Sequence, residues 1–262
     1  MADVAKLVAT GKTPLGISYE PDTIIAGASN LHVTAVAALV PTALNSLIAP
    51  EKSGIKTAAD LKGRSVGTPG IPSDDVFLKA IAKENGFTTS DMKKVNVGAG
   101  LLPAVLSGKV DSIIGGYRNI EAIQVKARGL NPTVIPVTEA GVPAYDELVI
   151  LANSDKLKSD ASYQAMVKAF LGALAKGNAD AVADPTGATD AMKAVIKGYP
   201  KSQVADMVAA TAPLLNNPKG FGQMDLAAWQ SFADWMTTNK MISKKVDTST
   251  LATNDYLPQG QG

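Results

Sequence analysis

Gly115-Gly116-Tyr117-Arg118-Asn119-Ile120-Glu121 is the stretch from which we predict the fold. It follows an apolar run over residues 110–114 that is typical of a buried strand. It precedes a helical pattern that reaches Ala127 and ends at Gly129. The two glycines let the backbone turn and let another group approach it closely. The stretch is therefore predicted to be a corner between a strand and a helix.

The corner contains polar and aromatic side chains that are suited to ligand binding. A phenol, a guanidinium, a carboxamide and a carboxylate follow the glycines within five residues, from Tyr117 to Glu121. In open α/β sheets, ligands bind at the carboxyl ends of strands, where helix N-termini point their N–H groups. Two interpretations are open at this stage: a small-molecule site, or an ordinary turn whose polar groups cap the next helix.

Short strands and helical patterns alternate around this corner. The alternation over residues 65–137 predicts a mainly parallel sheet flanked by helices. Earlier strands are predicted at residues 15–18, 32–39 and 44–49, and a strand at residues 148–152 is expected to rejoin them. We therefore predict an α/β fold with two lobes, residues 1–61 with 146–262 and residues 62–145, with a hinge and a ligand cleft between them.

A second candidate loop is Thr68-Pro69-Gly70-Ile71-Pro72-Ser73-Asp74-Asp75, which is rich in turn formers. Ser73 is the predicted N-cap of the next helix, and Asp74 and Asp75 suit the positive end of that helix. The backbone N–H groups from Gly70 to Ser73 are therefore candidates for binding an anion.

The C-terminal part of the chain is predicted to be helical and to belong to the first lobe. Pro185 is expected to end one long helix, and Asp225 to cap the last helix. Trp229 has the helical spacing of a core residue. The tail Gln259-Gly260-Gln261-Gly262 is predicted to be disordered.

Composition excludes several classes of function. The 262 residues carry a net charge of +1, which argues against a nucleic-acid partner. The chain has no cysteine, so thiol nucleophiles, disulfides and thiolate metal sites are excluded. No secretory signal opens this sequence, since residues 2–10 have an amphipathic helical pattern.

The corner and several further motifs resemble the solute-binding proteins of ABC importers. The branch that it resembles most captures thiamine-precursor pyrimidines, beside the sulfonate and nitrate types. The other motifs are Leu101-Leu102-Pro103-Ala104-Val105-Leu106-Ser107-Gly108-Lys109-Val110-Asp111, Gly16-Ile17-Ser18-Tyr19-Glu20-Pro21-Asp22, Ser53-Gly54-Ile55-Lys56-Thr57-Ala58-Ala59-Asp60-Leu61-Lys62-Gly63, Gly141-Val142-Pro143-Ala144-Tyr145-Asp146-Glu147-Leu148 and Thr253-Asn254-Asp255-Tyr256-Leu257-Pro258.

This resemblance implies a type II periplasmic-binding-protein fold that closes by a hinge on a small heteroaromatic or anionic ligand. It implies an ABC permease as partner and a periplasmic or other extracytoplasmic location. The ligand-binding residues that it implies are Ser18, Tyr19, Tyr117, Asn119, Glu121 and Tyr145. Relatives usually show Trp where this chain has Arg118, a side chain that could stack on a ring, pair with an anionic ligand or point to solvent.

Members of the resembled family begin with a strand, a helix and a strand that have no counterpart in this sequence. The first lobe is therefore predicted to be incomplete at its N-terminus, with a vacant sheet position. A bare strand edge invites pairing with another chain, so dimerisation through that edge is expected.

No catalytic residue, cofactor or metal is predicted. His32 is the one histidine, and neither a triad partner nor a metal-ligand pattern accompanies it. Two alternatives remain beside the receptor: an enzyme like the pyridoxal-phosphate-dependent pyrimidine synthases, and the effector-sensing domain of a transcription regulator. The second alternative would need a winged helix-turn-helix, which this sequence does not contain.

Overall fold

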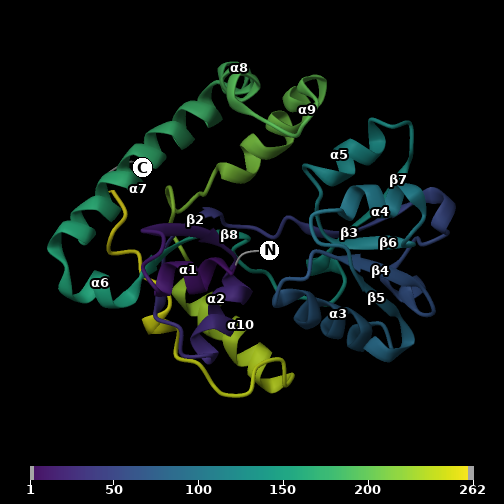
Figure 1. The fold of residues 1–262 in the computed structure, drawn as a ribbon, viewed down its shortest axis with the longest axis horizontal. Coiled ribbons are helices and arrows are strands. Elements are labelled where there is room, and N and C mark those ends of the chain that lie inside the picture. Colours follow the sequence, from purple (N-terminus) through teal and green to yellow (C-terminus); the bar gives the residue numbers. More distant parts are fainter. Residues whose placement is uncertain (1–2, 259–262) are drawn as a thin grey trace. The chain divides into compact units, whose positions relative to one another are not determined.

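The computed structural model describes residues 3–258 and divides them into two compact units (Figure 1). The first unit comprises Ala43–Ala144 and Gly198–Met207, and the second comprises residues 3–42, Tyr145–Lys197 and residues 208–258. Within the described residues, the chain therefore passes between the units four times. The tail predicted to be disordered lies outside the described residues.

The first unit is built on a five-stranded sheet in the order β5-β4-β6-β3-β7. The strands are β3 (Asn45–Pro50), β4 (Ser65–Thr68), β5 (Lys93–Asn96), β6 (Ser112–Tyr117) and β7 (Pro132–Pro136). Its helices are α3 (Ser73–Glu84), α4 (Leu101–Ser107), α5 (Glu121–Lys126) and the first part of α9 (Lys201–Thr211). Ile48, Val105, Ile113 and Val125 are fully buried in one core cluster, so α4 and α5 pack on this sheet.

The sheet of the first unit is mixed rather than mainly parallel. β4 runs parallel to β5 and to β6, whereas β3 runs antiparallel to β6 and β7. We predicted that residues 44–49 belong with the first lobe, with a boundary after residue 61. The structure corrects this, because the two neighbours of β3 lie in the five-stranded sheet and the chain therefore enters that unit at Ala43.

The second unit holds a three-stranded sheet in the order β1-β8-β2. β1 (Leu15–Ser18) and β2 (Val33–Val40) both run antiparallel to β8 (Leu148–Asn153). Beyond β2, the backbone of Ala35 exchanges hydrogen bonds with Leu251 and Thr253. In the described part of the chain, β1 has no hydrogen-bonded strand on its other side, and its Ile17 side chain is 54% exposed. Pairing of that edge with a second copy stays a prediction.

Helices bury both faces of this three-stranded sheet. The helices whose residues join its core clusters are α1 (Val4–Ala9), α2 (Glu20–Ala28), α6 (Ser154–Ser159), α7 (Ala161–Ala183) and α10 (Leu226–Thr238). The second unit also holds α8 (Pro185–Val195) and the end of α9. Leu151 of β8 shares a core cluster with Trp229 of α10, while Ile150 shares another with Val167 of α7. Trp229 is thus a core residue, as predicted. Among the described residues, no helix has both the length and the apolar character needed to cross a membrane.

Candidate functional site

The Gly115–Glu121 corner forms as predicted at the end of β6. Gly115 has φ +85°, and a Cβ added there would lie 2.6 Å from Cδ of Pro69, so glycine is required for two reasons. The Gly115 N–H donates to Oδ1 of Asn45 at 2.9 Å, which ties the corner to the start of β3. The corner is therefore held by its neighbouring strand and by the loop that follows β4.

Glu121 fixes the turn between β6 and α5. Its Oε2 accepts a 2.7 Å hydrogen bond from the Tyr117 N–H. Burial raises the pKa of the Glu121 carboxyl, and the hydrogen bond from Tyr117 partly opposes that rise. Asn119, between them in the sequence, is 4% exposed. A phenol, a carboxamide and a carboxyl thus lie within a single turn.

Arg118 faces the protein's own backbone. Its side-chain Nη1 donates to the Ala43 carbonyl, and its backbone N–H donates to the Leu44 carbonyl at 3.2 Å. The guanidinium is therefore hydrogen-bonded to Ala43, the residue at which the chain enters the first unit. The sequence left three roles open for Arg118: stacking on a ring, pairing with an anionic ligand, or pointing to solvent. Its hydrogen bond to Ala43 shows that the side chain does not simply point to solvent.

The loop after β4 lies at the same edge of the sheet, because β4 and β6 are parallel neighbours. The N–H groups of Gly70 and Ile71 donate to Oδ2 of Asp74 at 2.7 and 2.9 Å. The donors proposed for an anion are thus engaged by an internal carboxylate. Burial raises the pKa of Asp74. Ser73 is the first residue of α3 and not its N-cap, a position that Pro72 takes.

The second unit has a corner of its own. Ser18 pairs with Val149 and Val40 pairs with Leu148, so the ends of β1 and β2 and the start of β8 meet at one edge. Tyr19 occupies the N-cap position of α2. The predicted residues Ser18 and Tyr19 are thereby brought to the same edge as the segment just before β8.

A reciprocal pair of hydrogen bonds joins this corner across 126 residues of sequence. The Glu20 N–H donates to the Asp146 carbonyl at 3.2 Å, and the Asp146 N–H donates to Oε2 of Glu20 at 2.7 Å. Glu20 is 2% exposed. Burial raises the pKa of its carboxyl well above 4.5, and the negative charge of Asp146 adds to the rise.

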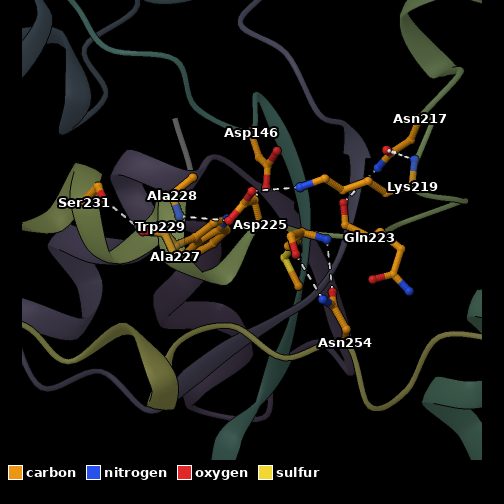
Figure 2. Close-up of polar contacts among 11 residues, drawn as sticks. Asp146, Asn217, Lys219, Gln223, Asp225, Ala227, Ala228, Trp229, Ser231 and Asn254 are labelled. Atoms are coloured by element: carbon orange, nitrogen blue, oxygen red, sulfur yellow. Dashed lines mark hydrogen bonds and ion pairs between the residues drawn. The ribbon is translucent and has the colours of Figure 1, made fainter.

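The Asp146 side chain extends this arrangement to α10. Trp229 Nε1 donates to Asp146 Oδ2 at 2.8 Å. Figure 2 shows both residues beside the exposed ion pair of Lys219 with Asp225. Asp225 also caps α10 by accepting from the Ala228 N–H, as predicted. The pKa of Asp146 is raised mainly by burial, while the Trp229 hydrogen bond opposes that rise.

Tyr145 is enclosed by its own unit. Its side chain is 5% exposed, its ring lies 5.7 Å from that of Phe232, and its hydroxyl donates to Oε2 of Glu147 at 2.8 Å. The ring is therefore already packed against protein. The ligand-binding roles predicted for Tyr145 and for the other corner residues stay predictions.

Sequence reasoning did not single out Tyr199. This residue lies in Gly198–Met207, the segment that belongs to the first unit together with Glu121. Burial raises the pKa of the Tyr199 phenol, and the negative charge of Glu121 raises it further. Its flanking residues Gly198 and Pro200 are turn formers and were the available signal.

His32 lies away from both corners in sequence and pairs with Asp155. Its Nδ1 is 2.7 Å from Asp155 Oδ2, and both side chains are more than half exposed. The histidine therefore forms an ordinary surface contact between two elements of the second unit.

Comparison with known proteins places the chain among small-molecule-binding relatives. The profile of the family described as NMT1/THI5 like matches residues 1–188. A formylaminopyrimidine-binding protein of Halalkalibacterium halodurans is 30% identical over 249 residues, which cover 93% of this chain and 74% of that protein. A protein of Haemophilus influenzae named for thiamine biosynthesis is 32% identical over 243 residues, covering 91% and 74%.

Other matches bear on the fold and on the enzyme alternative. The alkanesulfonate-binding protein SsuA from Xanthomonas axonopodis pv. citri, bound to MOPS, superposes with a TM-score of 0.73 at 19% identity, covering 95% of this chain and 83% of that one. That likeness shows the fold, a two-lobe type II periplasmic-binding-protein fold, as predicted. A 4-amino-5-hydroxymethyl-2-methylpyrimidine phosphate synthase of Schizosaccharomyces pombe is 28% identical over 114 residues, which cover 44% of this chain and 33% of that protein. The match over most of the chain establishes that this protein belongs to the NMT1/THI5-like family.

Proposed function

We propose that this protein is the solute-binding receptor of an ABC importer and that its ligand is an aminopyrimidine related to formylaminopyrimidine. The receptor would work outside the cytoplasm and deliver the ligand to a membrane permease. The relative from Halalkalibacterium halodurans, which is named for binding formylaminopyrimidine and matches 93% of this chain, supports this assignment.

The observation that carries the proposal is the Glu121 carboxyl, held at the end of β6 beside Tyr117 and Asn119. An aminopyrimidine presents an amino donor and ring-nitrogen acceptors in one plane, with an aromatic face above it. A carboxyl accepts from the amino group, a carboxamide both donates and accepts, and a phenol ring stacks. Because burial raises the pKa of Glu121, the carboxyl also has a protonated form that donates to a ring nitrogen.

The contacts of Arg118 and Asp74 favour a pyrimidine over an anion. Arg118 donates to the Ala43 carbonyl, and the Gly70 and Ile71 N–H groups donate to Asp74. The two groups that the sequence offered to an anionic ligand are thus engaged inside the first unit. Closure of a hinge over the ligand stays a prediction.

Isothermal titration calorimetry with formylaminopyrimidine and with an alkanesulfonate tests the proposal. We expect tight binding of the pyrimidine alone. Glu121→Ala is expected to weaken it by about 1–3 kcal/mol, the cost of leaving polar groups unpaired in a dry site. Glu139→Ala, an exposed glutamate of the same unit, is the control. Preference for the sulfonate, or equal affinity of the wild type and Glu121→Ala, would contradict the proposal.

The alternative function is a pyrimidine synthase, which the partial match to fungal synthases suggests. We infer that the protein is not such an enzyme. The one histidine, His32, is exposed and forms a surface pair with Asp155. Appearance of a cofactor absorbance band in the purified protein, with turnover, would contradict this inference.

A further inference from the structure

Strand β6 contains one extra residue just before its end. Ser46 of β3 pairs with Gly116 of β6. Two residues later in β3, Ile48 pairs with Ile113, so the register between the strands has shifted by one. One residue of β3 therefore faces two residues of β6, an arrangement known as a β-bulge. The second of the two is Gly115, whose φ of +85° is a left-handed conformation that glycine adopts at such bulges.

The bulge decides on which face of the sheet Tyr117 lies. In a regular strand, Ile113 and Tyr117 would share a face, because side chains alternate and the two residues are four positions apart. The extra residue reverses this alternation. A Cβ added to Gly116 would lie 3.2 Å from Cδ1 of Ile113 and 3.0 Å from Cδ1 of Ile48, so positions 113 and 116 share a face. Tyr117 therefore takes the face opposite to Ile113, away from the core cluster that α4 and α5 cover.

Asn45 supplies the hydrogen-bond acceptor that the bulge requires. A bulge leaves its extra residue without a partner in the strand ladder, and a buried N–H without an acceptor is costly. Oδ1 of Asn45 accepts from the Gly115 N–H at 2.9 Å. Asn45 is the first residue of β3, pairs with Tyr117 in the register and is 3% exposed. Its side-chain amide thus takes the place that a main-chain carbonyl has in a regular pair of strands.

The residues that follow the bulge carry the proposed ligand contacts. The Tyr117 N–H donates to Oε2 of Glu121 at 2.7 Å, so the path of β6 after Gly115 also determines where this carboxyl lies. Groups that recognise a ligand have to be held within about 0.5 Å of their productive positions by the residues that support them. Loss of the acceptor at position 45 would favour another backbone path at Gly115 and would move both groups.

We propose that Asn45 is a positioning residue for ligand binding, because its side chain holds the bulge that presents Tyr117 and Glu121 to the ligand. This inference rests on the proposed function and adds to it a residue of the neighbouring strand. Asn45 acts through Gly115 and is assigned no contact with the ligand. The property that position 45 has to provide is a hydrogen-bond acceptor of the length of an asparagine side chain.

The first experiment needs no ligand. An NMR titration with ¹³C labelling follows the Glu121 carboxyl in the wild type and in Asn45→Leu, which has a similar shape but no acceptor. When the bulge relaxes, the hydrogen bond from the Tyr117 N–H weakens and the pKa of Glu121 rises further, because that bond stabilises the carboxylate. Asn85→Leu is the matched control, since Nδ2 of Asn85 donates to two backbone carbonyls elsewhere in the same unit. It should leave the Glu121 titration unchanged.

The second experiment measures formylaminopyrimidine binding by calorimetry. Asn45→Leu is expected to weaken binding roughly tenfold, the scale set by one unpaired buried N–H. Asn45→Asp keeps an acceptor oxygen at the same distance from the backbone and should stay within about threefold. Asn85→Leu is expected to lower the free energy of unfolding without changing affinity. Chemical denaturation shows whether each variant is folded, and Asn45→Ala, which removes the acceptor without adding bulk, replaces Asn45→Leu if that variant does not fold.

The outcomes separate the two proposals. Unchanged affinity in Asn45→Leu, with weakened binding in Glu121→Ala, would overturn the role of Asn45 and leave the receptor function standing. Equal losses in Asn45→Leu and Asn45→Asp would overturn the role of the acceptor at Gly115. Absence of any pyrimidine binding by the wild type would overturn the receptor function, whereas the ligand-free titration would still report whether Asn45 positions the Glu121 turn.

Discussion

The two corners of this protein use the same device, a glutamate that accepts a backbone N–H, for different ends. Glu121 accepts from Tyr117, four residues earlier, and so stiffens one turn. Glu20 accepts from Asp146, 126 residues later, and so joins two distant segments of the second unit. The first bond is local and leaves its carboxyl partly accessible, whereas the second is buried at 2% exposure.

This difference separates a binding group from a structural one. A carboxylate that is buried with its hydrogen bonds made inside the protein has little left to offer a ligand, and its loss is felt as instability. A carboxylate that is partly exposed at a turn can still accept hydrogen bonds from a ligand. We therefore expect changes at Glu20 to alter the free energy of unfolding and changes at Glu121 to alter affinity.

The largest effect is expected for Glu20→Ala. This change leaves the Asp146 N–H without its acceptor and opens a cavity beside α2, which should lower the free energy of unfolding by about 2–4 kcal/mol. Chemical denaturation of this variant beside Glu121→Ala checks the comparison. If Glu121→Ala proved the more destabilising of the two, the assignment of structural and binding roles would have to be reversed.

The pH dependence of stability sharpens the same contrast. A carboxyl whose pKa is higher in the folded than in the unfolded state binds its proton more tightly when folded. The free energy of unfolding therefore falls as pH rises from about 4.5 through the raised pKa of Glu20. Denaturation curves between pH 4 and 8 should show this fall in the wild type and a shallower one in Glu20→Gln, which cannot titrate. Parallel pH profiles would refute a buried, titrating Glu20.

The smallest effect is expected for Arg118→Ala. Because Arg118 donates to the Ala43 carbonyl, its removal should cost roughly 1 kcal/mol of stability and leave pyrimidine affinity within about threefold. Arg118→Lys keeps the charge without the planar guanidinium and serves as the control. A strong loss of affinity at unchanged stability would mean that the guanidinium serves the ligand instead of the backbone.

Local patterns in the sequence predicted the parts of this molecule that local chemistry controls. The glycine corner, the Asp225 cap and the buried Trp229 follow from residue type and spacing, and the structure confirms all three. Such features depend on neighbours within a few residues or on the polarity of one sheet.

The remainder depends on pairings that no short pattern records. An apolar strand such as β3 fits either sheet by its composition, so its partners β6 and β7 were not predictable. Two further features depend on long-range pairing in the same way. They are the hydrogen bond between Glu20 and Asp146 and the placement of Gly198–Met207 in the first unit. In the loop after β4, the N–H groups of Gly70 and Ile71, which were expected to bind an anion, donate to the Asp74 carboxylate instead. Propensity rules do not predict this contact.

The central place of β8 has a consequence for synthesis on the ribosome. β1 and β2 do not pair with each other, and the strand that joins them, Leu148–Asn153, is translated more than a hundred residues after β2. The whole five-stranded sheet of the first unit emerges in the meantime, since its strands all lie between Asn45 and Pro136. The five-stranded sheet can therefore form first, while β1 and β2 remain unpaired until β8 is synthesised. During that interval their apolar strand edges are available for chaperones to bind.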